Sequence, residues 1–293
     1  MILVFGSINI DLLVPVPALP RPGETVLGGD YQLLPGGKGA NQALAARRAG
    51  AAVMMAGAVG TDGFAEAALK SLRRDGIDLE LVRRGERPTG CAAIMVGEAG
   101  ENLIALAPGA NGEAVAAAVP DGLLGPGTIV VCQNEVPMRE TAALLRRARS
   151  RGAGTLLNLA PAGPIEAGLL PNLDYLVVNE VEAATLGSDP AALARELRQV
   201  LVVTRGARGA IAYPHEGGRI EVPALTIDPV DTTGAGDTFV GVLAASLDQG
   251  LTLEAALRRA SVAASLACLA RGAQTVMPNR TTIDAAVARL PER

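Results

Sequence analysis

The segment best suited to chemistry covers residues 231–239 and reads Asp-Thr-Thr-Gly-Ala-Gly-Asp-Thr-Phe. Glycine and alanine leave the backbone open to a ligand, and the apolar residues that follow predict a helix. The N–H groups at a helix start attract negative charge, so Gly234, Ala235 and Gly236 could hold a transferring phosphoryl group. Asp237 is then a candidate general base, although an acid in a first helical turn also stabilises the helix dipole.

Two segments near the N-terminus carry polar groups suited to a ligand rich in hydroxyls. Asn9 and Asp11 follow the first predicted strand two residues apart, so both face one side of an extended chain. An amide and a carboxylate suit hydroxyls that donate and accept, whereas a polar turn would also explain the pair. Gly36-Gly37-Lys38-Gly39-Ala40-Asn41 opens the next helix, where its glycines admit a ligand or serve helix packing.

A further pair, Asn179 and Glu182, follows another predicted strand and shares one face if a helix begins there. A contact with metal-bound water or phosphate explains the pair as well as an N-cap with its capping-box acid does. The glycines of 36–41 do not have phosphate-binding P-loop spacing, and residues 57–63 lack the dinucleotide fingerprint. The sequence therefore argues against a dehydrogenase.

The composition sets limits on the function. The net charge is −4 without a basic stripe, which argues against a nucleic-acid partner. His215 is the only histidine, which argues against a Ser-His-Asp triad or a histidine-based metal site. The three cysteines lack metal-ligand spacing and indicate buried residues in a reducing compartment. The apolar stretches are too short to cross a bilayer and no basic leader precedes them, so we expect a cytoplasmic protein without a membrane partner.

Short β-branched stretches alternate with helical stretches rich in Ala, Leu and Arg, which predicts an α/β fold with a parallel sheet covered on both faces. The expected strands are 2–5, 52–56, 128–132, 155–158, 175–178 and 200–204, with a hairpin over 209–213 and 219–222, and the expected helices are 39–49, 64–75, 139–151, 190–197, 235–248 and 252–270.

Three extended segments, about 11–16, 24–33 and 89–106, do not fit this alternation. We expect them to form a small second sheet that projects from the main domain. Because its pieces are discontinuous in sequence, we interpret this sheet as a lid on a single domain over 1–293.

Four motifs occur in a fixed order: Gly-Ser-Ile-Asn-x-Asp from Gly6, Gly-Gly-Lys-Gly-Ala-Asn from Gly36, Asn-x-x-Glu from Asn179 and Asp-Thr-x-Gly-Ala-Gly-Asp from Asp231. In this order they resemble the ribokinase-like carbohydrate kinase family over nearly the whole chain. The resemblance implies a three-layer α/β/α domain with a small β-sheet lid. It also implies phosphorylation of a sugar by ATP with Mg²⁺. Residues 100–102 and 109–111 are similar to members that convert D-ribose to D-ribose 5-phosphate.

The resemblance also implies roles for individual residues. It makes Asp237 the general base and the backbone of Gly234, Ala235 and Gly236 the anion hole. It assigns Asn9, Asp11, Gly37, Lys38, Asn41 and Glu135, with Asp237, to the sugar; Asn179, Thr204, Gly206, Gly209 and Gly236 to the nucleotide; and Asp231, Thr233, Gly272 and Glu182 to metal sites. It further implies K⁺ or another monovalent cation as activator, and a homodimer through the lid, whose strand edges and apolar face would otherwise be exposed.

Two alternatives remain open at this point. A fructokinase-like or nucleoside kinase of the same family would use the same Asp237 on another acceptor. A catalytically silent sugar-binding regulator would keep the fold without turnover, and the intact Gly234–Asp237 segment argues against it.

Overall fold

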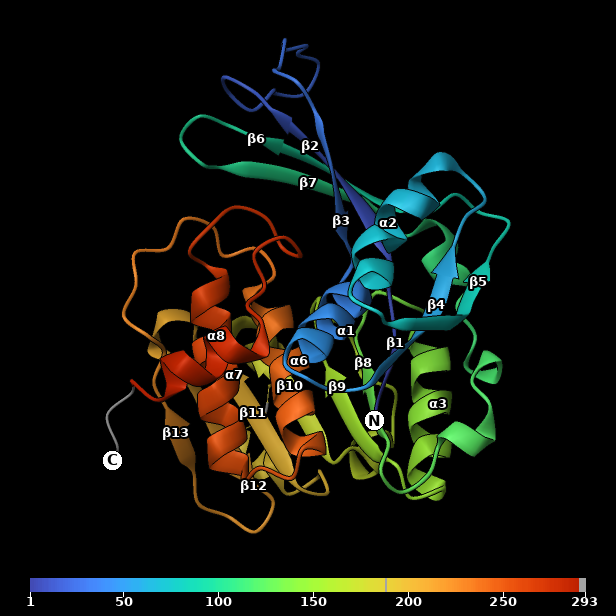
Figure 1. The fold of residues 1–293 in the computed structure, drawn as a ribbon, viewed down its shortest axis with the longest axis vertical. Coiled ribbons are helices and arrows are strands. Elements are labelled where there is room, and N and C mark those ends of the chain that lie inside the picture. Colours follow the sequence, from blue (N-terminus) through green and yellow to red (C-terminus); the bar gives the residue numbers. More distant parts are fainter. Residues whose placement is uncertain (188, 290–293) are drawn as a thin grey trace.

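Nine strands form one large sheet in the computed structural model, which describes residues 1–187 and 189–289 (Figure 1). The strand order is β13-β12-β11-β10-β9-β8-β1-β4-β5. Neighbours from β11 to β5 are parallel, and β12 and β13 extend one edge antiparallel, which confirms the mostly parallel sheet. The strands are β1 (Ile2–Phe5), β4 (Val53–Val59), β5 (Asp78–Arg84), β8 (Ile129–Cys132), β9 (Gly154–Asn158), β10 (Tyr175–Asn179), β11 (Val200–Thr204), β12 (Ala210–Pro214) and β13 (Ile220–Val222).

Helices cover both faces of this sheet, giving the three layers expected from the sequence. One face carries α1 (Lys38–Arg48), α2 (Gly63–Arg74), α6 (Ala235–Asp248), α7 (Leu253–Ala267) and α8 (Arg280–Val287), and the other α3 (Met138–Ser150), α4 (Glu180–Thr185) and α5 (Pro190–Ala194). In the part of the chain that the structure describes, no helix is both long and apolar enough to cross a membrane.

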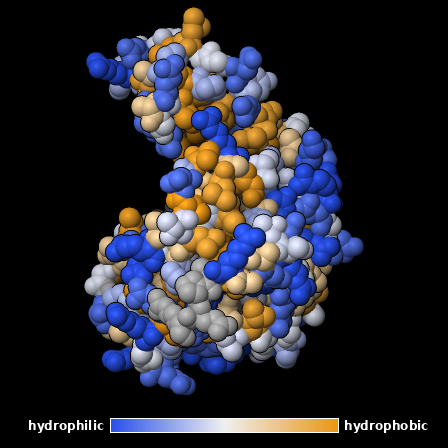
Figure 2. Space-filling view, turned by 60° about the vertical axis from the view of Figure 1, so that its left-hand side comes forward, coloured by the Kyte–Doolittle hydropathy of each residue, from blue (hydrophilic) through white to orange (hydrophobic). Residues whose placement is uncertain are grey.

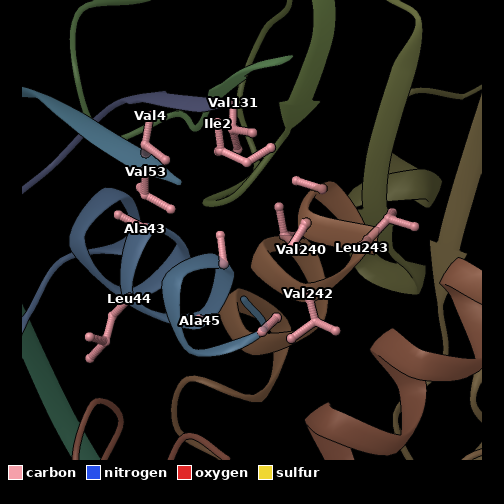
Figure 3. Packing of buried hydrophobic residues seen from close by; sticks show 14 of the residues in the cluster. Ile2, Val4, Ala43, Leu44, Ala45, Val53, Val131, Val240, Val242 and Leu243 are labelled. Carbon is pink, nitrogen blue, oxygen red and sulfur yellow. The ribbon is translucent and has the colours of Figure 1, made fainter. Parts of the chain in front are cut away.

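The central strand β1 shows how the sequence divides the core. Successive side chains of a strand point to opposite faces, so Ile2 and Val4 pack toward α1 and α6 while Leu3 and Phe5 join the cluster around α3. All four are buried, and each contributes on the order of 1.5–3 kcal/mol by burial. Figure 3 shows Ile2 and Val4 above α1, with Val240 of α6 beside them.

A four-stranded sheet projects from this body in the order β3-β2-β6-β7. Its strands are β2 (Asn9–Pro15), β3 (Gln32–Gly36), β6 (Gly90–Val96) and β7 (Asn102–Ala107). Figure 1 shows it at the top of the molecule, and Figure 2 shows the outline indented between it and the body. Of the segment expected to be extended over 24–33, residues 24–31 form a loop that contains Gly28 and Gly29, and β3 begins only at Gln32.

Other boundaries also differ from expectation. The helix predicted over 252–270 ends at Ala267, and the helix predicted over 190–197 ends at Ala194. The strand β5 and the helix α8 were not predicted, and a helix at α4 was expected only under one of the two explanations of Asn179 and Glu182. β5 carries charged residues on a half-exposed strand, and α4 is too short for a clear helical period. Of the expected domain over 1–293, residues 188 and 290–293 lie outside the described residues.

Candidate active site

Asp237 lies in the first turn of α6, and its side chain is buried against α1. Asn41 donates from Nδ2 to Asp237 Oδ2 over 2.9 Å, and Gln42 donates from Nε2 to Oδ1 over 3.0 Å. Gly234 precedes the helix with φ 75°, a left-handed conformation that favours glycine. Two side chains from α1 therefore fix both oxygens of the predicted base.

The backbone amides at the start of α6 form part of the predicted anion hole. Among the described residues, the N–H groups of Gly234 and Gly236 have no hydrogen-bond partner. The Ala235 N–H donates to the carbonyl of Thr232 over 3.2 Å. Two of the three predicted amides are thus free to bind an anion, whereas the third is used within its own loop.

The predicted sugar-contacting residues converge where β2 meets the start of α1. Asn9 and Asp11 share one face of β2, as expected from their spacing. A Cβ at Gly37, whose φ is 89°, would lie 2.7 Å from the Asn9 nitrogen, and one at Gly36 would lie 2.4 Å from the Asp11 carboxylate. A larger residue at position 37 would displace the backbone of β2 from the helix, and one at position 36 would displace the Asp11 carboxylate.

Glu135, which follows β8, binds the start of α1 from outside the helix. Its Oε2 accepts from Ser7 Oγ over 2.5 Å and from the Lys38 N–H over 3.1 Å. The helix lacks a capping side chain at Gly37 itself. Glu135 thus satisfies a free N–H of the first turn and places its carboxylate beside Lys38.

Lys38 stands among four acids, which sets the electrostatics of the site. The carboxylate of Asp237, followed by those of Glu135, Glu182 and Asp11, raises the pKa of Lys38 above its ordinary value despite burial. Burial, together with the charges of Glu135 and Asp237, raises the pKa of Asp11 from 3.8 to about 6, and Lys38 offsets part of this rise. Lys38 therefore stays protonated and balances the negative charge around Asp237.

A cavity of about 330 Å³ lies on the other side of the α6 start. Its wall is mostly apolar and includes Phe239 and Cys268. Five of the predicted phosphate- and nucleotide-contacting residues line it: Thr204, Gly206, Gly209, Ala235 and Gly236. Gly209 has φ 81°, and a Cβ there would stand 2.0 Å from the Val222 carbonyl oxygen. The turn after β11 thus requires glycine for its own conformation, whatever the cavity binds.

Asn179 and Glu182 form the capping box that was one of their two predicted explanations. Asn179 Oδ1 accepts from the Glu182 N–H, and Glu182 Oε2 accepts from the Asn179 N–H, both over 2.8 Å. The other oxygen of Glu182 has no hydrogen-bond partner among the described residues. Burial, then the charge of Asp237, raises the pKa of Glu182, although the Asn179 N–H and Lys38 act against this rise.

Asp231 joins the loop before α6 to the loop that contains Gly272. Its Oδ1 accepts from the N–H and the hydroxyl of Thr233 over 2.9 and 2.7 Å, and its Oδ2 accepts from the Gly272 N–H over 2.9 Å. Burial disfavours the charged form, but the Gly272 and Thr233 hydrogen bonds outweigh it, so the pKa of Asp231 lies below its ordinary value. Three of the four residues predicted for metal sites are therefore neighbours.

Sequence reasoning missed several polar residues of the site. Asn111 donates to Asn9 Oδ1 over 2.6 Å, and Gln274 donates to Asn41 Oδ1 over 3.1 Å. Gln42, Gln133 and Asn158 form a further buried network behind Asp237. Asn158 ends β9 and Gln133 follows β8, and polar residues at the carboxyl ends of parallel strands are a signal that could have found both.

The comparison with protein families shows which family this fold belongs to. The family model "pfkB family carbohydrate kinase" matches residues 1–280, and the chain belongs to this family. The chain is 38% identical over 291 residues to the ribokinase of Bacillus subtilis (strain 168), which covers 97% of this chain and 98% of that protein.

Two solved structures share the whole fold. The ribokinase of Thermotoga maritima superposes with a TM-score of 0.92 at 29% identity, over 98% of this chain and 99% of that one. The ribokinase of Arabidopsis thaliana, complexed with ribose and ATP, superposes with a TM-score of 0.89 at 29% identity, over 98% of both chains. The α/β/α architecture with its small sheet is thus the family fold, and the protein is a carbohydrate kinase.

Proposed function

We propose that the protein transfers the γ-phosphoryl group of ATP to the 5-hydroxyl of D-ribose. The observation that carries the proposal is the position of Asp237, which lies between the cluster around β2 and the cavity whose wall includes Gly236. Ribose and ATP placed on these two sides would meet at the start of α6. The full-length similarity to ribokinases supports ribose as the acceptor.

In the proposed reaction the sugar oxygen attacks the γ-phosphorus as the bond from phosphorus to the ADP oxygen breaks. Asp237 accepts the hydroxyl proton, and the free N–H groups of Gly234 and Gly236 stabilise the charge on the transferring group. Asn9, Asp11 and the other predicted sugar contacts hold the hydroxyl in line. Alignment and charge neutralisation supply most of the rate enhancement in this kind of transfer.

The proposed cofactors match the donors that the structure offers. No group of three or more His, Cys, Asp or Glu residues suited to a metal occurs within residues 1–187 and 189–289, so Mg²⁺ would be held mainly by ATP. Mg²⁺ bound with ATP neutralises phosphate charge. Glu182, with one oxygen free, fits a contact with its water shell. Asp231, kept ionised beside Thr233 and Gly272, fits a monovalent cation such as K⁺.

We also propose that the small sheet is a lid within one domain and the contact surface of a homodimer. Its strands are separated in sequence by α1, β4 and α2, so it lacks a continuous chain of its own. Exposed apolar side chains gather on it and on the loop before β3: Leu27, Tyr31, Leu33, Leu103, Ile104 and Leu106. A second copy would cover this surface. Because the reaction consumes ATP, we propose that it takes place in the cytoplasm.

The test is ADP release with ATP, Mg²⁺ and D-ribose, beside fructose and adenosine as other acceptors. Replacing Asp237 with Asn removes the base and is expected to lower kcat by about 10²–10⁴-fold. The matched control is Asp228→Asn, an exposed acid nearby, which is expected to keep full activity. If fructose or adenosine supported turnover and ribose did not, the proposed acceptor would change from ribose to that compound. Ribose binding without turnover on any acceptor would favour the silent regulator.

A further inference from the structure

Three buried amide side chains lie behind the Asp237 carboxylate, and none of the roles given above uses them. Gln42 of α1, Gln133 after β8 and Asn158 at the end of β9 are 0%, 0% and 7% exposed. Gln42 Nε2 donates to Asp237 Oδ1 and also to Asn158 Oδ1, each over 3.0 Å. Gln42 Oε1 accepts from Gln133 Nε2 over 2.7 Å. Every polar atom of the Gln42 side chain is therefore bonded.

The direction of these hydrogen bonds is set by the main chain. Asn158 Nδ2 donates to the Val177 carbonyl, which can only accept, so Asn158 Oδ1 must face Gln42. Gln42 then has to present its NH₂ group to Asn158 and to Asp237. A flipped Gln42 amide would place its oxygen against the Asp237 carboxylate and against Asn158 Oδ1. The network thus permits a single orientation of the donor to Asp237.

Within the described part of the chain, one polar atom of the Gln133 side chain is left without a hydrogen bond, which lowers the stability of the folded state. Its Oε1 is buried and has no hydrogen-bond partner among the described residues, a situation that costs about 1–3 kcal/mol. A Cβ at Gly6 would lie 1.8 Å from this oxygen, so the glycine is what leaves room for the side chain. An apolar residue at position 133 would remove this unpaired oxygen but would leave the buried Gln42 Oε1 without its donor, so Gln133 is needed to complete the hydrogen bonds of Gln42.

Asn41 and Gln42 hold the two carboxylate oxygens differently. Asn41 is a predicted sugar contact and is 6% exposed, whereas Gln42 is completely buried. Gln42 is therefore the donor that holds the carboxylate whether or not a sugar is bound. Each oxygen of Asp237 keeps a further lone pair, so a proton can still be accepted while the plane of the group is fixed.

We propose that Gln42, oriented by Gln133 and Asn158, is a positioning residue that fixes the rotation of the Asp237 carboxylate toward the sugar hydroxyl. This inference rests on the proposed role of Asp237 as general base. It assigns the buried amides to the transfer step and leaves sugar affinity to the residues around β2.

The first test is Gln42→Leu, which removes the donor at similar volume. We expect kcat to fall about 10–100-fold, because a small misplacement of a reacting group has effects of this size, with the KM for ribose changed less than about threefold.

Asn158→Leu and the double variant test whether the amides act as one unit. Because Asn158 reaches Asp237 only through Gln42, its replacement should lower kcat in the wild type but not in the Gln42→Leu background. If Gln42→Leu does not fold, Asn158→Leu alone is expected to show the same loss of kcat with the KM for ribose nearly unchanged. Additive losses of kcat in the double variant would overturn the inference.

Gln249→Leu is the matched control, because this amide contacts the Ala49 carbonyl and Arg259 at the far end of α1. It should lower the melting temperature and leave kcat unchanged. Asp237→Asn separates the two proposals. Full turnover in Asp237→Asn would show that Asp237 is not the base. Loss of turnover there, with normal kcat in Gln42→Leu, would overturn only the positioning role.

Discussion

Gly241 stands one helical turn after Asp237 and touches the backbone of Gln42 across the contact between α6 and α1. A Cβ at position 241 would lie 2.4 Å from the Gln42 carbonyl oxygen and 2.7 Å from the Ala45 Cβ, far inside van der Waals distance. The missing side chain lets the two helices approach closely. This approach brings Asn41 and Gln42 within hydrogen-bond distance of Asp237.

Gly241→Ala should therefore affect both stability and activity. The added methyl group forces α1 and α6 apart, which is expected to lower the free energy of unfolding by about 1–3 kcal/mol. Because the displacement also lengthens the hydrogen bonds to Asp237, kcat should fall at the same time. Urea unfolding and ADP release measure the two effects.

Gly63→Ala is the control for the Gly241 variant. Gly63 begins α2, and a Cβ there would meet no atom within 4 Å. Alanine favours a helix over glycine by up to about 1 kcal/mol, so this variant should be at least as stable as the wild type and fully active. A Gly241→Ala enzyme with unchanged stability and kcat would show that the close helix contact does not position the base.

The sequence predicted the large sheet well because its signals are local. Strands such as β1 and β11 are short apolar stretches rich in β-branched residues, bounded by glycine or polar residues. The small sheet was predicted less well. Its strand β3 pairs with β2 only from Gln32 onward, and no local pattern in the preceding loop marks where the pairing begins.

The residues of the candidate site also fall into those that local sequence predicts and those that it does not. Asp237 and Asn41 were found because each follows glycines at a helix start, and the structure joins them by a hydrogen bond. The contacts of Gln133 and Asn158 with Gln42 depend on the spatial order of β1, β8 and β9, which lie far apart in sequence. Such contacts arise from tertiary packing, so residue spacing alone does not predict them.

We expect Asp11 to make the binding of the sugar depend on pH. With a pKa of about 6, caused by burial and by Glu135 and Asp237, Asp11 becomes protonated between pH 7 and 5. A carboxylate accepts hydrogen bonds from sugar hydroxyls at both oxygens, and protonation removes part of this capacity. The KM for ribose should therefore rise as pH falls through 6, and Asp11→Asn should abolish this rise. Asp30→Asn, an exposed acid near β3, is the control, and a flat KM from pH 5 to 8 in the wild type would contradict the role.

The same group affects stability with a definite sign. The pKa of Asp11 is higher in the folded protein than its ordinary value of 3.8, so the folded state binds the proton more tightly. Its contribution to stability is therefore lost as pH rises from about 4 to 6. Asp11→Asn should gain stability relative to the wild type over this range, as measured by urea unfolding. An increase in wild-type stability relative to the variant would contradict this assignment.

Asp231 should link cation activation to the two loops that it joins. In Asp231→Asn, one carboxylate oxygen becomes an NH₂ group that cannot accept from Gly272 or Thr233. We expect K⁺ to raise kcat of the wild type relative to tetramethylammonium, and this activation to be lost in the variant. Asp228→Asn should retain it. Equal wild-type rates in the two salts would contradict the cation site, and activation that persists in Asp231→Asn would place it elsewhere.

Ile104 lies on β7, an edge strand whose six residues are all exposed although five of them are apolar. Its side chain is 57% exposed. A free edge with an apolar face favours pairing with a second copy, and a lysine there disfavours it. Ile104→Lys should therefore shift the protein from dimer to monomer in size-exclusion chromatography with light scattering. Glu98→Lys, in the turn before β7, changes charge without entering the apolar face and should stay dimeric. A wild-type monomer at high concentration, or a dimeric Ile104→Lys variant, would show that β7 is not the contact.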